Sequence, residues 1–210
     1  MFIKDHMTPN PITISSHTPV LEALDILKKH KIRQLPVVDN GALTGLVTRY
    51  DLLTVSPSPA TTLSVFEMNY LLSKMVVREV MIKNPPTISP EASIEEAAVI
   101  MREKKIDSLL VLENGKLTGI ITESDLFEAL IQLFGFRRAG TRIVIETDNR
   151  VGALADLLDI VREHNISVIG IACVERPEAK VQVVLRLSTT EPASLVEDFK
   201  NKGVDVRSIS

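Results

Sequence analysis

Two stretches of the chain repeat one pattern of apolar and polar positions. Each begins with apolar residues at helical spacing, namely Val20, Ala23, Leu24 and Leu27, then Ile94, Ala97, Ala98 and Met101. Each continues with two short apolar runs on either side of an Asn-Gly pair, 35–38 with 43–47 and 109–112 with 117–121. Because Asn-Gly favours positive φ at both central residues, each pair of runs predicts a β-hairpin. We expect a β-α-β-β-α unit in each stretch.

The repeat extends to individual residues without a gap. Ile3-Lys4-Asp5-His6-Met7 returns as Val77-Arg78-Glu79-Val80-Met81, and Asn10-Pro11 returns as Asn84-Pro85. Such self-similarity predicts two copies of one supersecondary unit. A residue before proline is excluded from the right-handed helical region, so each Asn-Pro predicts an extended start. Because alanines fall at matching helix positions, we expect the copies to pack helix face against helix face about a pseudo-twofold axis.

Four segments follow from these patterns. We assign the first copy to residues 1–55, a linker with a connecting helix (63–75) to 56–76, and the second copy to 77–134. Residues 139–210 change pattern and predict β-α-β-β-α-β, which is a ferredoxin-like order. The expected fold class is α/β and α+β.

The sharpest motif is Gly45-Leu46-Val47-Thr48-Arg49-Tyr50-Asp51, repeated as Gly119-Ile120-Ile121-Thr122-Glu123-Ser124-Asp125. Together with the Asn-Pro-x-Thr-Ile-Ser starts, it resembles a tandem pair of CBS domains, a Bateman module. That resemblance implies an adenosine ligand, such as AMP, ADP, ATP or S-adenosylmethionine, held as a regulatory ligand and not as a cofactor. The implied nucleotide-binding residues are Thr13, Ile32, Thr48, Arg49, Asp51, Thr87, Ile106, Thr122 and Asp125.

Elementary chemistry agrees with this site and leaves one alternative open. Thr48 and Thr122 precede helices, whose N-termini attract anions. One turn later, Asp51 and Asp125 can accept hydrogen bonds from the ribose hydroxyls. Thr-x-x-Asp is also an ordinary helix cap, so either copy can hold a site kept only for structure. Arg49 would attract phosphate where Glu123 would repel it. We therefore expect the first copy's site to take the more phosphorylated ligand.

The C-terminal loop 148–154 resembles that of an ACT domain, which implies paired domains and an amino-acid ligand at Asn149, Gly152, Ala153 and Leu154. Dimerisation without any ligand is the alternative. The complete domain order resembles that of acetoin-utilisation regulatory proteins, which implies control of acetoin or related carbon metabolism. We expect a homodimer and a protein target of unknown kind.

Composition narrows the function further. The chain has 210 residues, 45% of them hydrophobic and 24% charged, with a net charge of −3 and scattered basic residues. We therefore expect no nucleic-acid partner, and no apolar run suggests a membrane partner. The single cysteine, Cys173, indicates a reducing cytoplasm and has the apolar neighbours of a core residue. The four histidines lack metal-ligand spacing and no catalytic set is visible, so we expect neither a metal site nor an enzyme, with a nucleotide-acting enzyme and a purely structural dimer as alternatives.

Overall fold

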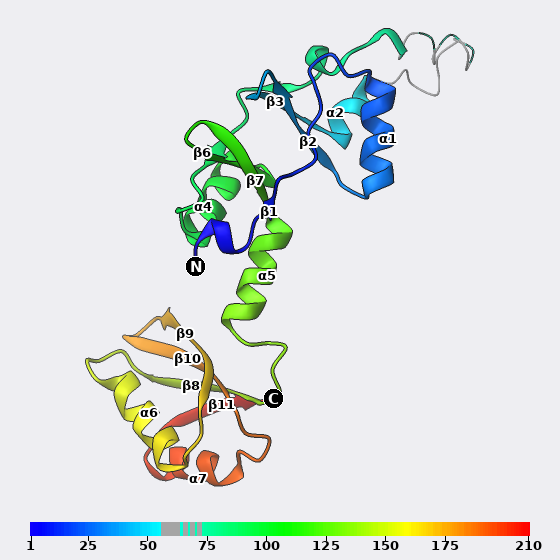
Figure 1. The fold of residues 1–210 in the computed structure, drawn as a ribbon. Coiled ribbons are helices and arrows are strands. Elements are labelled where there is room, and N and C mark those ends of the chain that lie inside the picture. Colours follow the sequence, from blue (N-terminus) through cyan, green and yellow to red (C-terminus); the bar gives the residue numbers. More distant parts are fainter. Residues whose placement is uncertain (56–63, 65–66, 68–69, 71–72) are drawn as a thin grey trace. The chain divides into compact units, whose positions relative to one another are not determined.

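The computed structural model describes residues 1–55, 64, 67, 70 and 73–210 (Figure 1). It divides into two compact units, Met1–Leu126 and Phe127–Ser210, which are described separately. Most of the connecting helix predicted over 63–75, with Phe66 and Leu71, lies outside the described residues. No helix among the described residues is long and apolar enough to cross a membrane.

The first copy contains the predicted hairpin and both of its helices. Asn40 and Gly41, at the turn, have φ values of 51° and 79°, which confirms the expected positive-φ pair. A 3-10 helix and one short β-strand precede α1 and begin the copy. Its elements are η1 (Ile3–Asp5), β1 (Thr8–Pro9), α1 (Val20–His30), β2 (Gln34–Asp39), β3 (Ala42–Thr48) and α2 (Arg49–Thr54).

The second copy repeats this order with one additional short strand, β5, where the first copy has an isolated bridge between Ile14 and Val37. Asn114 and Gly115 close its hairpin with φ values of 50° and 77°. Asn10 and Asn84, predicted to be extended, instead have φ values of 47° and 52°. Both adopt the left-handed helical conformation, which asparagine tolerates and which also avoids the right-handed region that the following proline disfavours. The elements are η2 (Val77–Glu79), β4 (Ile82–Lys83), β5 (Thr87–Ile88), α4 (Ile94–Lys104), β6 (Ser108–Glu113), β7 (Lys116–Thr122) and α5 (Glu123–Leu133).

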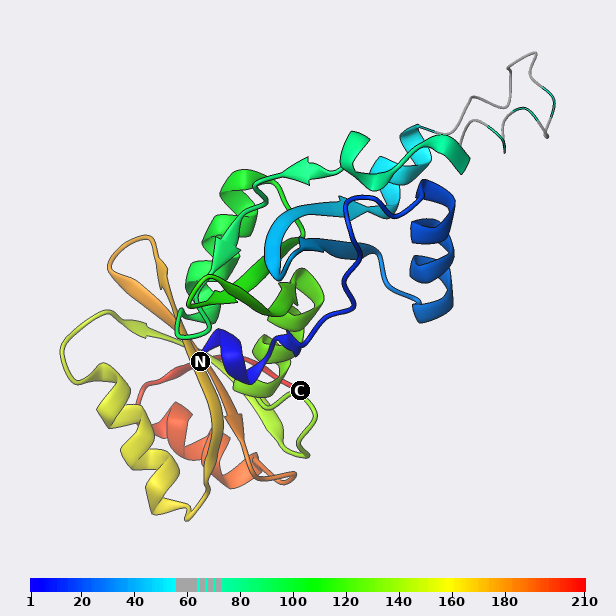
Figure 2. The ribbon, with the colours of Figure 1, turned by 45° about the horizontal axis from the view of Figure 1, so that its top comes forward.

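Each copy gives its first residues to the other copy. β1 pairs with β7 of the second copy, and β4 pairs with β3 of the first, so both pairings are antiparallel and cross between copies. Figure 2 shows the blue N-terminal segment running beside the green strands of the second copy. The amide of Ile3 donates to Ala92 O (3.0 Å), and at the equivalent place the amide of Val77 donates to Thr18 O (2.9 Å). The copies are thus joined by a reciprocal exchange of segments.

This exchange corrects the expected packing of helix faces. Ala23 is fully buried, but in a core with Leu35 and Val37 of its own hairpin, and Ala98 is exposed. The exchanged strands and the contact of β3 with β7 form the junction instead. The apolar side of α1 is already buried against the strands of its own copy, so it does not need to pack on a helix of the other copy.

The second unit contains a four-stranded antiparallel sheet in the order β11-β8-β10-β9, with α6 and α7 packed on one of its faces (Figures 1 and 2). This order and the β-α-β-β-α-β succession confirm the predicted topology. Ile143, Leu185 and Phe199, each fully buried, lie in the core between sheet and helices. The elements are β8 (Thr141–Asp148), α6 (Ala153–Glu163), β9 (Val168–Arg176), β10 (Lys180–Leu187), α7 (Ala193–Asn201) and β11 (Asp205–Ile209).

The prediction of a core position for Cys173 is wrong, since this residue is exposed. Cys173 lies opposite the buried Val183, but β9 is at the edge of the four-stranded sheet, beside β10. Alternating apolar residues look the same in an edge strand and in a central one, which is why the sequence pattern misplaced this residue.

Candidate functional site

The strand-to-helix turns of both copies have the same local structure. Thr48 caps α2: its hydroxyl accepts from the amide of Asp51 (3.2 Å), while Asp51 Oδ2 accepts from Thr48 N (2.9 Å) and Oγ1 (2.7 Å). In the second copy Asp125 Oδ2 accepts from Thr122 N and Oγ1, both at 2.8 Å. These bonds are the capping function that Thr-x-x-Asp can serve. Among the described residues, Oδ1 of either aspartate accepts no hydrogen bond, so one oxygen of each remains available to a ligand.

A cavity of about 850 Å³, which we call the Thr48 cavity, opens at the first of these turns. It combines Thr48 and its neighbours from the first copy with the residues around Ile106 from the second. Apolar walls with a few polar groups are typical of small-molecule sites. Its lining residues are Arg33, Gln34, Leu46, Thr48, Arg49, Tyr50, Leu53, Ile82, Pro86, Met101, Arg102, Lys105, Ile106, Asp107, Ser108 and Glu123.

A smaller cavity of about 350 Å³, the Thr122 cavity, opens at the second turn. It uses the same repeat positions with the copies interchanged: Thr122 for Thr48, and Ile32 for Ile106. The two cavities are therefore related by the internal repeat, and neither is complete within one copy. Its lining residues are Thr8, Asn10, Pro11, Ile12, Lys31, Ile32, Arg33, Gln34, Pro36, Ile120, Thr122 and Ser124.

The predicted nucleotide-binding residues divide between these cavities. Thr48, Arg49 and Ile106 line the Thr48 cavity, and Ile32 and Thr122 line the other. The remaining four residues line neither cavity. Thr13 and Thr87 follow the lining residues Ile12 and Pro86 in sequence, and the two aspartates form the helix caps. These four are Thr13, Asp51, Thr87 and Asp125.

A polar bridge between the copies was not expected from sequence. Gln34 Nε2 donates to Asp107 Oδ1 (2.6 Å), and Ser108 Oγ donates to Gln34 Oε1. Gln34 and Ser108 are 9% and 3% exposed, so this bridge satisfies buried polar groups between the cavities. Arg33 lies beside Gln34 and lines both cavities. A signal was present in the sequence: after the shared Lys-Ile pair, the repeat changes from Arg-Gln to Asp-Ser.

The charges are not divided between the sites as the sequence suggested. Arg49 and Glu123 line the same Thr48 cavity, because the α5 N-terminus of the second copy also borders it. The Thr122 cavity contains Lys31 and Arg33 and no carboxylate among its lining residues. The expectation that Glu123 weakens phosphate binding at the second copy's own site is therefore wrong.

The C-terminal loop has its own cavity, of about 410 Å³. Of the four residues predicted there, only Ala153 lines it; Asn149, Gly152 and Leu154 do not. The amide of Asn149 donates to Ala179 O (2.7 Å), and Gly152, with φ of 86°, begins α6 in the left-handed region that favours glycine. The cavity is lined by Thr147, Asp148, Arg150, Ala153, Asp156, Leu157, Asp159, Ile160, Lys202, Gly203 and Val204.

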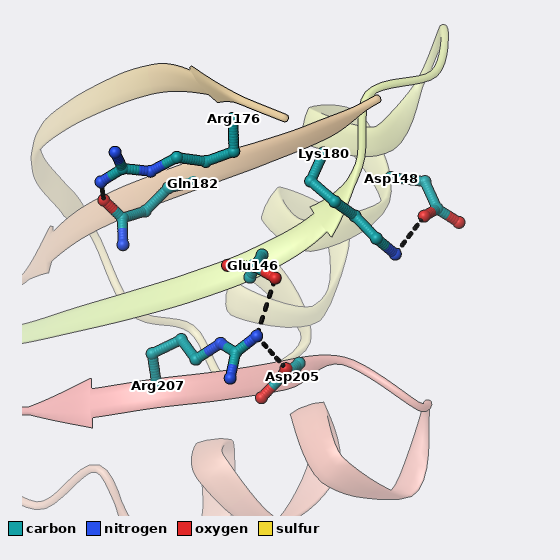
Figure 3. A network of polar contacts seen from close by, with 7 residues as sticks. All are labelled: Glu146, Asp148, Arg176, Lys180, Gln182, Asp205 and Arg207. Atoms are coloured by element: carbon teal, nitrogen blue, oxygen red, sulfur yellow. Dashed lines mark hydrogen bonds and ion pairs between the residues drawn. The ribbon is translucent and has the colours of Figure 1, made fainter. Parts of the chain in front are cut away.

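Ion pairs surround one end of this sheet (Figure 3). Lys180 Nζ lies 2.6 Å from Asp148 Oδ1, and this hydrogen bond lowers the pKa of Asp148 and raises that of Lys180. On the neighbouring strand Arg207 pairs with Glu146 (2.7 Å) and Asp205 (3.1 Å). Asp148 therefore enters its cavity as a charged group already paired with a lysine.

Comparison with known proteins identifies the first unit. The CBS domain family matches residues 3–58 and 77–132, which include both cavities' threonines. The chain belongs to the CBS-domain family. Among curated relatives, an inosine-5′-monophosphate dehydrogenase of Korarchaeum cryptofilum is 32% identical over 157 residues, 74% of this chain. The chain spans only 29% of that enzyme's length.

Solved CBS structures resemble the chain over a similar part. CBSX2 in complex with AMP is 33% identical, covers 62% of this chain and 96% of its own, and has a TM-score of 0.53. A putative acetoin utilization protein (AcuB) from Vibrio cholerae is 30% identical and covers 65% and 95%, with a TM-score of 0.55. The CBS pair of MJ0100, in complex with 5′-methylthioadenosine and S-adenosyl-L-methionine, is 26% identical and covers 62% and 99%, with a TM-score of 0.51.

Proposed function

We propose that this protein is a regulatory ligand sensor and not an enzyme, with a CBS pair that binds adenosine compounds such as AMP, ADP, ATP or S-adenosylmethionine. The observation that carries the proposal is the pair of repeat-related cavities, each of which joins a Thr-x-x-Asp turn of one copy to apolar residues of the other. CBS pairs of similar fold hold AMP, or 5′-methylthioadenosine and S-adenosylmethionine. A ligand that fills such a cavity touches both copies at once.

Within each cavity, the parts of an adenosine ligand have matching chemistry. Asp51 and Asp125 lie at the capped turns beside the cavities and not in their lining, and the free Oδ1 of either would accept a hydrogen bond from a ribose hydroxyl that reaches the turn, a charge-assisted bond typically worth about 1.5–3 kcal/mol. Ile106 or Ile32 supplies an apolar wall for adenine. Thr48 and Thr122 place the N-terminal ends of α2 and α5 at the polar side of the cavities.

For the second unit we propose an ACT-type role: pairing into a homodimer, with an amino acid as a candidate ligand near the loop 148–154. Arg150 and Lys202, with Asp148 and Asp159, line the cavity near this loop and offer charges of both signs to a zwitterion. The exposed nine-residue edge strand β9 supports pairing of two copies, since its outer backbone groups need partners. Regulation of acetoin or related carbon metabolism in the cytoplasm is the corresponding biological proposal, supported by the 30% identity to AcuB.

The test is calorimetric titration of the purified chain with AMP, ADP, ATP and S-adenosylmethionine, followed by chromatography of the recovered ligand. Asp51→Asn and Asp125→Asn form a matched pair, because the asparagine side-chain oxygen can still accept from the threonine amide at the helix start while the charge is removed. Loss of one charge-assisted bond weakens binding about ten- to a hundred-fold. We expect one variant to weaken a given ligand and the other to leave it unchanged.

The three other outcomes assign different functions. If no adenosine compound binds, the alternative of a purely structural, dimerising protein would be supported. Recovery of a chemically altered nucleotide would indicate an enzyme. Equal weakening in both variants would mean that the aspartates act through helix stability and not at a particular site.

A further inference from the structure

The two copies place opposite charges at equivalent positions around the Thr48 cavity. Arg33 and Arg49 of the first copy lie together because the amide of Arg49 donates to Arg33 O (2.8 Å). At the same positions of the second copy, the amide of Glu123 donates to Asp107 O (3.0 Å). All four residues line the cavity, so it has a cationic side and an anionic side.

The cationic side continues into a neighbouring cavity of about 490 Å³, which we call the Lys28 cavity. The two cavities share Arg33, Arg49 and Leu53. The Lys28 cavity adds two lysines and contains a single carboxylate, that of Asp25. Its lining residues are Leu24, Asp25, Leu27, Lys28, Lys31, Ile32, Arg33, Arg49 and Leu53.

Local structure explains only part of this charge. Lys28 and Lys31 are at the C-terminus of α1, where the helix dipole favours cations. Arg49 is the first residue of α2, where the dipole disfavours a cation, whereas its counterpart Glu123 has the favoured sign at the start of α5. Among the ion pairs between described residues, none includes any of the four cations of the Lys28 cavity. All four cations are exposed and have no carboxylate partner among the described residues, so they are accessible to an anionic ligand.

We propose that the Lys28 cavity binds the phosphate chain of a ligand whose nucleoside occupies the Thr48 cavity, so that the protein distinguishes ligands by their number of phosphates. This inference rests on the proposed nucleotide function. Asp107 and Glu123 repel the chain from one side, while Arg33 and Arg49 attract it toward the other. A monophosphate reaches only the shared arginines. A chain of three phosphates extends to the two lysines, which lie beyond the Thr48 cavity.

The test compares two neighbouring lysines of one helix. Lys28 lines the Lys28 cavity, whereas Lys29 is exposed on the same turn and lines neither that cavity nor the Thr48 or Thr122 cavity. Titration calorimetry at fixed ionic strength would measure AMP, ATP and inorganic tripolyphosphate against the wild type, Lys28→Glu and Lys29→Glu. Charge reversal of Lys28 should weaken ATP about ten-fold and AMP less than about two-fold, because only a close charge escapes screening by salt. Lys29→Glu should change neither.

Each outcome decides the question. ATP binding that is unchanged in Lys28→Glu, or equally weakened in Lys29→Glu, would overturn the inference and leave the proposed nucleotide function intact. Tripolyphosphate that binds as tightly as ATP and is weakened by Lys28→Glu would support the phosphate site but contradict a nucleoside contribution.

Discussion

Substitution of the two motif glycines tests the segment exchange directly. Gly45 and Gly119 lie where an exchanged methionine crosses a strand. A Cβ on Gly119 would meet Met7 Sδ and lie 3.1 Å from its Cγ and 3.2 Å from its Cε. A Cβ on Gly45 would lie 2.6 Å from Met81 Sδ, but also 3.0 Å from the backbone oxygen of Ile82. The thioether can rotate away, whereas the carbonyl moves only if β4 moves.

The expected costs follow from this difference. Overpacking of a filled site costs about 1–3 kcal/mol, and replacing a strand glycine by alanine returns about 0.5–1 kcal/mol through the unfolded chain. Gly119→Ala displaces only a flexible side chain, so we expect a net loss of at most ~1 kcal/mol. Gly45→Ala also displaces backbone, so we expect a net loss of about 1–2.5 kcal/mol. For a chain of this size, each kcal/mol lowers Tm by about 2–4 °C.

The assay is urea unfolding followed by hydrogen exchange, with peptides from 139–210 as an internal reference. Met7→Ala should relieve Gly119→Ala, giving a favourable coupling energy in the double-mutant cycle. Met81→Ala should relieve Gly45→Ala only in part, since the Ile82 carbonyl remains. The reasoning is refuted if Gly119→Ala costs as much as Gly45→Ala, or if neither methionine substitution couples to its glycine.

Three further predictions test individual residues. Hydrogen bonds from the Ser16 amide and neighbouring hydroxyls lower the pKa of Asp39 from 3.8 to about 2. The stabilising effect of the Asp39 carboxylate is therefore complete above about pH 4 and is lost as pH falls toward 2. Asp39→Asn should make the free energy of unfolding less dependent on pH in that window, and an unchanged pH profile would contradict this account. Phe199→Ala, at a fully buried position, should destabilise the C-terminal unit by about 3–5 kcal/mol in urea unfolding, and a loss below about 1 kcal/mol would argue against this core. Cys173 should react stoichiometrically with a thiol reagent in the native protein; reaction only after unfolding would restore the buried assignment.

The repeat predicted the elements of the CBS pair well because local signals determine them. The Asn-Gly turns, the amphipathic α1 and the capped α2 each depend on residues close together in sequence. The exchange of segments could not be predicted in this way. Ile3 and Val77 occupy equivalent positions, so pairing within a copy and pairing between copies would bury the same kinds of side chain. Only the three-dimensional course of the chain distinguishes the two arrangements.

The candidate site was predicted in its residue types but not in its grouping. The motif located Thr48 and Thr122, yet the exchange places each of them opposite apolar residues of the other copy. The same crossing brings Glu123 to the cavity of Arg49. A motif read along one copy cannot show which residues face it across a pseudo-twofold junction, so the charge argument failed there.

The exchange also explains how ligand binding can act on the protein as a whole. Val77, fully buried, belongs to the core of the first copy, and Ile3 is held by backbone bonds to the second, so neither copy has a complete core alone. A ligand that contacts residues of both copies would strengthen the same junction. At a concentration of 100 times its dissociation constant, it would stabilise the paired state by about 2.7 kcal/mol over a state in which the copies separate. A ligand confined to one copy would shift nothing in that equilibrium, so the proposed sensing function depends on cavities that cross the junction.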